Sequence, residues 1–151
     1  MKINLFLITS IIFSITACQS DDKLFTNLSK SKTGINFRNI LQESEELNVL
    51  NYMYFYNGGG VAVGDVNNDG LTDVLFTGNM VKNRLYINKG EMNFEDITAT
   101  SGVADAQGWC TGATMVDINQ DGWIFIFAAR RILVQKNERT CFTLIIKMEP
   151  S

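Results

Sequence analysis

The chain has 151 residues, of which 46% are hydrophobic, and its 13 basic and 16 acidic side chains give a net charge of −3. This length and composition suit one folded domain, whereas the acidic balance argues against binding nucleic acid through its phosphates. The sequence has no histidine. Its serines therefore lack the usual catalytic base, and we expect the chain not to be an enzyme.

Residues 1–17 have the pattern of an export signal. Lys2 is followed by an apolar run of signal-peptide length that is too short to span a bilayer comfortably. The run ends at Ile15-Thr-Ala-Cys18, which resembles the lipobox of bacterial lipoproteins, in which the cysteine receives a diacylglyceryl group. The alternative is a plain secretory signal with an incidental cysteine. We expect cleavage before Cys18, and lipidation of Cys18 as the membrane anchor.

Residues 18–56 are interpreted as a tether and lead-in segment. The residues after Cys18 are polar, and Asp21 and Asp22 resemble a surface-export signal of some Gram-negative lipoproteins. We therefore expect an exported protein anchored to the cell envelope, at the outer membrane or the cell surface. Loss of Lys2 with the signal leaves 12 basic and 16 acidic residues, a mature net charge of −4. The aromatic run at 52–56 predicts a strand that is buried on both faces.

An acidic loop that occurs twice is the most informative feature of the chain. The two copies begin at Asp65 and Asp117, 52 residues apart, and each places acidic or amide side chains at alternate positions before a glycine. Calcium takes six to eight oxygen ligands, and this spacing lets a short loop curl its oxygens around one ion. The first loop predicts a Ca²⁺ site formed by Asp65, Asn67, Asp69, the carbonyl of Leu71, and Asp73 directly or through water. An ordinary Asn/Asp/Gly turn without metal is the alternative.

The segments around the first loop read as strands and exclude an EF-hand. An EF-hand needs helices on both sides and a glutamate at the twelfth loop position, where this chain has Phe76 and Ala128. Residues 57–64 and 74–78 are instead short, β-branched or aromatic, and bounded by glycines. The triple glycine at 58–60 lacks the lysine and helix of a phosphate-binding loop, so we attribute it to close backbone packing.

Four short strands follow one another in the first repeat, near 60–65, 73–78, 84–88 and 94–98, which predicts one antiparallel blade. The second repeat restarts at Gly112, which aligns with Gly60, each five residues before its first aspartate. A period near fifty with four strands per period predicts a β-propeller. The fold class is therefore all-β: a partial β-propeller with one complete four-stranded blade and part of a second, after an N-terminal signal segment.

Residues 33–123 resemble the FG-GAP/VCBS-repeat proteins of bacteria, with the repeat region itself at 57–123, and particularly exported members that carry an ASPIC/UnbV domain. The resemblance rests on the segment 57–73, on Asn83-Arg-Leu-Tyr-Ile-Asn-Lys-Gly90, on Phe94-Glu-Asp-Ile-Thr98 and on Gly108-Trp109. It implies propellers like the head of integrin alpha chains, with calcium loops on the blades and roles in adhesion or ligand binding. By position, it implies a second calcium site that includes Asp117, Asn119, Asp121 and Trp123.

The chain departs from this pattern after Trp123. Phe125 stands where Asp73 closes the first loop, and no turn residues follow for ten positions. One interpretation is a divergent edge strand that has lost its site. The other is a shifted reading frame, because the shifted codons of 139–151 permit Asn-Leu-Phe-Tyr-Ile-Asn-Asn-Lys-Asp-Gly-Thr-Phe, which mirrors the segment from Asn83 to Phe94. We therefore hypothesise that residues 124–151 are an out-of-frame tail of a truncated product.

Two functions remain open from the sequence. The first is a lipid-anchored binding or adhesion module with structural calcium and an unknown protein or glycan ligand. The second is the non-catalytic N-terminal fragment of a larger envelope enzyme or polysaccharide-handling protein. One blade cannot bury both of its faces alone, so we also expect self-association through open strand edges.

Overall fold

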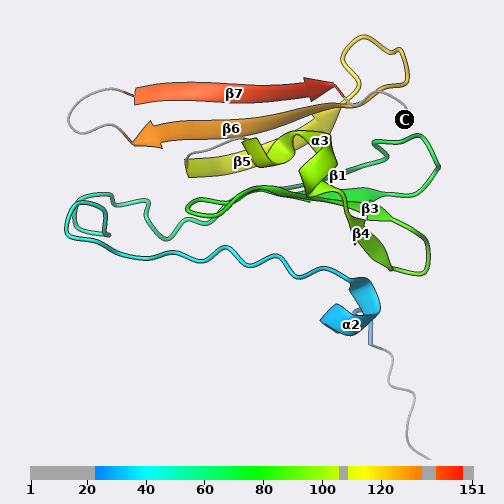
Figure 1. Ribbon diagram of the computed structural model, residues 1–151, viewed down its shortest axis with the longest axis horizontal. Coiled ribbons are helices and arrows are strands. Elements are labelled where there is room, and N and C mark those ends of the chain that lie inside the picture. Colours follow the sequence, from blue (N-terminus) through cyan, green and yellow to red (C-terminus); the bar gives the residue numbers. More distant parts are fainter. Residues whose placement is uncertain (1–22, 106–108, 134–138, 148–151) are drawn as a thin grey trace, which may run out of the picture.

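The computed structural model describes residues 23–105, 109–133 and 139–147. The predicted export signal and Cys18 lie outside the described residues. Strands dominate and form two antiparallel sheets, which confirms the all-β prediction (Figure 1). The first sheet has the order β1 (Val61–Gly64), β2 (Asp73–Phe76), β3 (Arg84–Asn88) and β4 (Phe94–Asp96), and the second has the order β5 (Trp109–Val116), β6 (Phe125–Leu133) and β7 (Arg139–Lys147).

The four strands of the first sheet fall within about two residues of the predicted ends and form the complete blade. Three short helical turns, α2 (Lys30–Thr33), α3 (Thr98–Ser101) and η1 (Val103–Asp105), lie outside the sheets. In the described part of the chain, no helix is long and apolar enough to cross a membrane. The second sheet begins with β5 in the predicted second repeat, but β6 and β7 lie within residues 124–151, the hypothesised out-of-frame tail.

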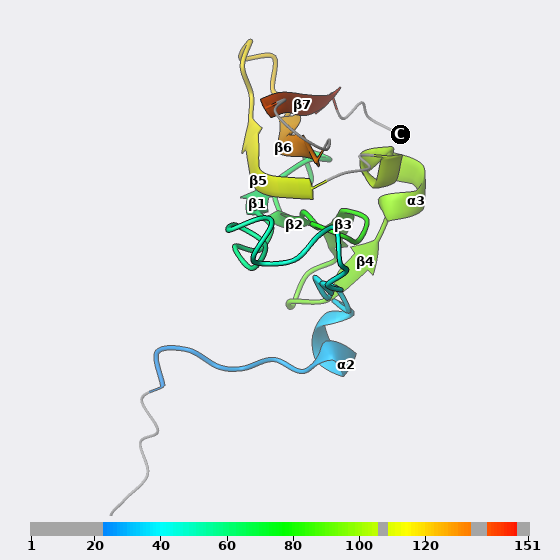
Figure 2. The same cartoon turned by 90° about the vertical axis from the view of Figure 1, so that its left-hand side faces the viewer.

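The hydrophobic core lies between the two sheets. Alternate residues of the blade, among them Leu75 and Leu85, are fully buried and belong to one cluster with Ile126 of β6. Figure 2 shows the second sheet stacked on one face of the first. This is the arrangement of neighbouring propeller blades, since each sheet alone would leave an apolar face in water.

The triple glycine allows the two sheets to approach closely, as the sequence predicts. A Cβ atom on Gly60 would lie 2.5 Å from the backbone nitrogen of Ala113 and 2.7 Å from Gly112. A Cβ atom on Gly59 would collide with the backbone of Thr77. A side chain at position 60 would therefore force the second sheet away from the blade, and one at position 59 would displace the segment that directly follows β2.

Residues 34–42, which we call the strap, cover the opposite face of the blade. Figure 1 shows this segment in cyan, running beneath the green sheet. The Phe37 ring stacks on Phe76 with centroids 5.1 Å apart, and the Tyr86 hydroxyl donates to Asn36 Oδ1 at 3.0 Å. The strap thus supplies apolar contacts on the blade face that the second sheet leaves open.

The predicted strand at 52–56 is wrong, because these residues form turns. Backbone hydrogen bonds close these turns: the Phe55 N–H donates to the Tyr52 carbonyl at 2.9 Å, and the Asn57 N–H donates to the Tyr54 carbonyl at 3.1 Å. In the preceding residues, asparagine side chains bond nearby backbone carbonyls and so compete with strand pairing. The expectation of burial holds for Phe55, which is fully buried and lies 5.3 Å from the ring of Trp109.

Candidate metal centre

The two acidic loops occupy equivalent places in the two sheets. The first joins β1 to β2 and leaves the sheet at the pair Gly64↔Asp73, whereas the second joins β5 to β6 and leaves it at Val116↔Phe125. Both members of the second pair lie 52 residues after their counterparts. The repeat read from the sequence is therefore also a repeat of strand register.

The first loop is held by its own carboxylates. Asp65 Oδ2 accepts from the Gly70 N–H at 2.7 Å, and Asp65 Oδ1 accepts from the Asp69 N–H at 3.1 Å. Asp69 accepts from the Leu71 N–H at 2.8 Å and from Asn67 Nδ2 at 2.9 Å. The predicted ligands Asp65, Asn67 and Asp69 are thus in contact with one another in one turn.

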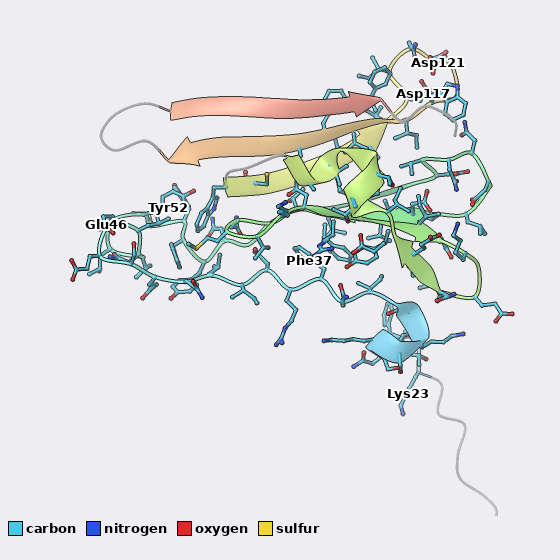
Figure 3. The ribbon with its side chains drawn as sticks, in the orientation of Figure 1. Lys23, Phe37, Glu46, Tyr52, Asp117 and Asp121 are labelled. Atoms are coloured by element: carbon cyan, nitrogen blue, oxygen red, sulfur yellow. The ribbon has the colours of Figure 1, made fainter. Side chains whose placement is uncertain are left out.

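The second loop repeats three of these four bonds. Asp117 Oδ2 accepts from the Gly122 N–H at 2.8 Å, and Asp121 accepts from the Trp123 N–H at 2.9 Å and from Asn119 Nδ2 at 2.8 Å. Figure 3 shows Asp117 and Asp121 at one end of the second sheet, in the loop between β5 and β6. Two loops of different sequence therefore adopt one conformation.

Backbone angles agree between the loops as well. Asn68 and Gln120 both have φ 59°, and Gly70 and Gly122 have φ 84° and 85°. Glycine adopts this left-handed conformation without steric cost, whereas glutamine does so only rarely. The sequence indicated the role of the glycines, but the left-handed residue between the second and third donors was missed, since its type differs between the two loops.

Asp73 lies inside the sheet and is fully buried. Its Oδ2 accepts from the Val66 N–H at 2.9 Å, and its Oδ1 accepts from the Asn88 N–H at 2.8 Å. Burial raises the pKa of the Asp73 carboxyl; the two N–H bonds oppose this shift, and the charges of Asp69 and Asp65 add to it. The Asp73 carboxylate therefore interacts electrostatically with Asp65 and Asp69 of the loop, although its hydrogen bonds are to backbone N–H groups.

Asn88 is a residue of the site that the sequence did not reveal. Besides the N–H bond to Asp73, its Nδ2 donates to the carbonyl of Thr72 at 3.1 Å. It connects the end of β3 to the end of the loop. Its only sequence signal is its place in the turn Asn88-Lys-Gly90, which is typical of any hairpin.

The donor atoms fit a hard cation, because every predicted ligand offers oxygen. Within the described ranges, however, no three His, Cys, Asp or Glu side chains gather around one point. In the first loop, Asp73 does not join Asp65 and Asp69 because its carboxylate accepts hydrogen bonds from the backbone. In the second loop, Phe125 stands at the position of that third carboxylate. One observation favours a cation nonetheless: Asp117 Oδ1 is buried and has no hydrogen-bond partner. A carboxylate oxygen in this state is costly unless an ion or water approaches it.

Comparison with known proteins agrees with the repeat. Residues 65–127, which contain both loops, match the family described as FG-GAP-like repeat. The chain is also similar to Cartilage acidic protein 1 of Xenopus tropicalis, with 36% identity over 72 residues. That alignment covers 47% of this chain and 11% of the relative, so the chain spans a small part of that protein's length. These matches support an FG-GAP-like repeat as the source of the two equivalent loops.

Proposed function

We propose that this chain is a calcium-stabilised binding or adhesion module, exported and anchored to the cell envelope through a lipid on Cys18, with no catalytic activity of its own. The match to the FG-GAP-like repeat supports a propeller-like binding module. The observation that carries the calcium proposal is the bond from a glycine N–H to the first aspartate that the two loops share, together with the unpartnered Asp117 Oδ1.

In each loop, one carboxylate oxygen is fixed by a glycine N–H, at 2.7 Å for Asp65 and 2.8 Å for Asp117. This bond holds each carboxylate in place; the other oxygen has no hydrogen-bond partner in Asp117, whereas in Asp65 it accepts from the Asp69 N–H at 3.1 Å. Asn67 and Asp69, or Asn119 and Asp121, supply further side-chain oxygens, and the carbonyls of Leu71 and Trp123 complete the two sets. Calcium, when bound, would supply positive charge that offsets the repulsion among these carboxylates.

Terbium luminescence tests the second loop directly, since Tb³⁺ is a hard cation and Trp123 supplies one of the proposed ligands. We expect Tb³⁺ emission on excitation of tryptophan, and loss of the emission when Ca²⁺ is added in excess. Asp117→Ala should abolish the signal. Trp123→Phe should abolish the emission while Ca²⁺ binding, measured by calorimetry, persists.

The first loop has no tryptophan, so Leu71→Trp provides a matched reporter there; Leu71 is 37% exposed and tolerates a larger side chain. Emission from this variant in a Trp123→Phe background should disappear with Asp65→Ala. Trp109 is present in every variant and is the internal control. Emission that survives Trp123→Phe without the new tryptophan, or calorimetry without any Ca²⁺ binding, would refute the calcium proposal.

The lipid anchor is a separate proposal with its own test. Metabolic labelling with a radioactive fatty acid in a Gram-negative host should label the wild-type chain and not Cys18→Ser. The variant should move from the membrane fraction to the soluble fraction. Equal labelling of both proteins would contradict an anchor at Cys18.

A further inference from the structure

A basic cleft opens between the strap and the turn that joins β2 to β3. Its volume is about 470 Å³, within the range of about 300–1,000 Å³ that small-ligand sites occupy. Three cationic side chains line it, Arg38 from the strap, Lys82 from the turn and Arg84 from β3, and no acidic residue does. The chain as a whole has a net charge of −3, so the positive charge of the cleft is a local feature of the surface.

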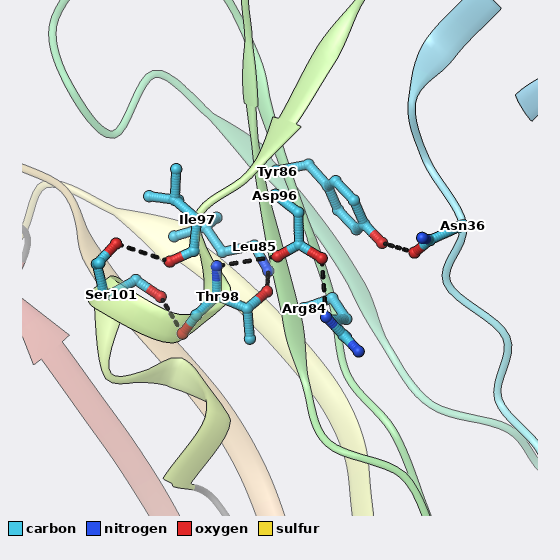
Figure 4. Close-up of polar contacts among 9 residues, drawn as sticks. Asn36, Arg84, Leu85, Tyr86, Asp96, Ile97, Thr98 and Ser101 are labelled. Carbon is cyan, nitrogen blue, oxygen red and sulfur yellow. Dashed lines mark hydrogen bonds and ion pairs between the residues drawn. The ribbon is translucent and has the colours of Figure 1, made fainter. Parts of the chain in front are cut away.

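The cations retain unused hydrogen-bond donors. Arg84 Nη1 donates to Asp96 Oδ2 at 2.8 Å, as Figure 4 shows, and a guanidinium has four further N–H groups. The side chains of Arg38 and Lys82 make no ion pair or hydrogen bond with any residue that the structure describes. Arg38 and Lys82 therefore present positive charge that the rest of the described chain does not neutralise, whereas the charge of Arg84 is paired with that of Asp96.

The remaining surface of the cleft is apolar with one amide. Ile40 and Met80 are 53% and 43% exposed, and Phe37 contributes an edge while its ring stacks on Phe76. Asn36 adds a side-chain amide whose oxygen already accepts from Tyr86. A ligand that fits this lining has a negative group, hydroxyls for the amide, and a hydrocarbon face for the apolar side chains.

We propose that this cleft binds an acidic oligosaccharide, with a uronate carboxylate held by Arg38, Lys82 and Arg84 and a sugar ring against Ile40 and Met80. Arginine binds carboxylates through two parallel N–H bonds, which suits such a group. An extended acidic peptide fits less well, because β3 is paired on both sides by β2 and β4 and leaves no strand edge beside the cleft.

The site goes beyond the calcium proposal, because it uses none of the loop residues. The loop precedes β2 and the turn follows it, so the two sites lie at opposite ends of that strand. Binding at the cleft can therefore be measured in variants that lack either calcium loop.

The experiment is calorimetric titration of the full chain with tetragalacturonate, with maltotetraose as the neutral control and tetraglutamate as the acidic peptide. We expect binding of tetragalacturonate alone, weakened at least about tenfold by the double variant Arg38→Ala/Lys82→Ala. Lys89→Ala removes one positive charge from the β3–β4 turn, outside the cleft, and should leave the affinity unchanged. Higher salt should weaken binding in the wild type.

Circular dichroism confirms that each variant is folded, and Arg38→Gln alone provides a milder change at the strap. Asp117→Ala should bind tetragalacturonate as the wild type does, so failure of the calcium proposal leaves this one standing. Affinity that is unchanged in the double variant, equal binding of maltotetraose, or tighter binding of tetraglutamate would each overturn the proposal.

Discussion

Asp73 holds together the ends of the first loop, since its carboxylate accepts N–H bonds from Val66 before the bend and from Asn88 on β3. We predict that Asp73→Ala lowers the free energy of unfolding by about 2–4 kcal/mol, because two backbone N–H groups lose their acceptor in the interior. Relief of repulsion from Asp65 and Asp69 offsets only part of this cost. Urea denaturation in EDTA measures the effect without calcium. Thr72→Ala, on an exposed neighbour, is the control and should change stability by less than about 0.5 kcal/mol.

Asp96 makes the stability of the blade depend on pH. Burial opposes ionisation of this carboxyl, but hydrogen bonds from Thr98 and the Arg84 guanidinium outweigh it and lower the pKa of Asp96. A carboxyl with a lowered folded pKa contributes stability above its unfolded pKa of about 3.9, and loses it as the pH falls through the folded value. We therefore predict that Asp96→Asn is less stable than the wild type at pH 7 and that the difference shrinks at pH 2–3.

Denaturation at pH 7, 4 and 2.5 measures this difference. Glu45→Gln, an exposed carboxyl in the lead-in segment, is the matched control and should follow the wild type at every pH. A constant gap between Asp96→Asn and the wild type would show that the contact with Arg84 and Thr98 does not depend on ionisation.

At the scale of elements, the sequence predicted what each strand and loop determines locally. Asp65, Asn67, Asp69 and Gly70 specify a turn through their own side chains and φ angles, and the flanking β-branched and aromatic residues favour strands. The blade and both loops could therefore be found from spacing alone. The hydrogen bonds of Asp73 to backbone N–H groups could not be found in this way, because its partners Val66 and Asn88 come together only when three strands assemble.

The lead-in segment shows the opposite case. Residues 52–56 have strand composition but pair with no described strand, and local backbone hydrogen bonds close turns there instead. The strap has no periodic signal either, and its place is fixed by partners 39 to 50 residues away, such as Phe76 and Tyr86. β6 also formed within the hypothesised out-of-frame tail, since alternating Ile and Phe favour a strand whatever their origin.

The strap is open to a direct test. Phe37→Ala removes the ring that stacks on Phe76, and we predict a loss of about 2 kcal/mol in the free energy of unfolding, less than for a fully buried ring. Amide hydrogen exchange should accelerate at 34–42 and in β2. Ile40→Ala, an exposed neighbour on the same segment, should change neither quantity appreciably. Equal effects of both substitutions would mean that the stack with Phe76 contributes nothing specific.

For the whole molecule, the free edges of the sheets determine association. β4 is a three-residue edge that carries exposed Glu95 and Asp96, and such short charged edges resist pairing, whereas β7 is a nine-residue edge. We predict concentration-dependent dimers in sedimentation experiments, with hydrogen-exchange protection that increases at 139–147 and not at 94–96. Monomers at every concentration, or protection at β4, would contradict this prediction.

The origin of residues 124–151 bears on that edge. Phe125 occupies the register position that Asp73 has in the first sheet. Under the shifted-frame hypothesis, Phe125 stands there because the change of frame replaced the residue that the unshifted gene encodes. Sequencing the gene from codon 110 to several hundred bases past codon 151 tests it. Further acidic loops in a shifted frame would support the hypothesis, and an uninterrupted reading frame without further repeats would make β6 and β7 native strands.

The strap also has a consequence for folding during synthesis. It leaves the ribosome before the residues of the blade that it contacts, because Asn79 and Tyr86 follow their partners Asn39 and Asn36 by 40 and 50 residues. Until β2 has emerged, Phe37 lacks the ring of Phe76 on which it stacks. A chain synthesised from its N-terminus therefore passes through a period in which the strap is present but cannot dock, and this interval, set by distance along the sequence, is when chaperones and proteases have access to it.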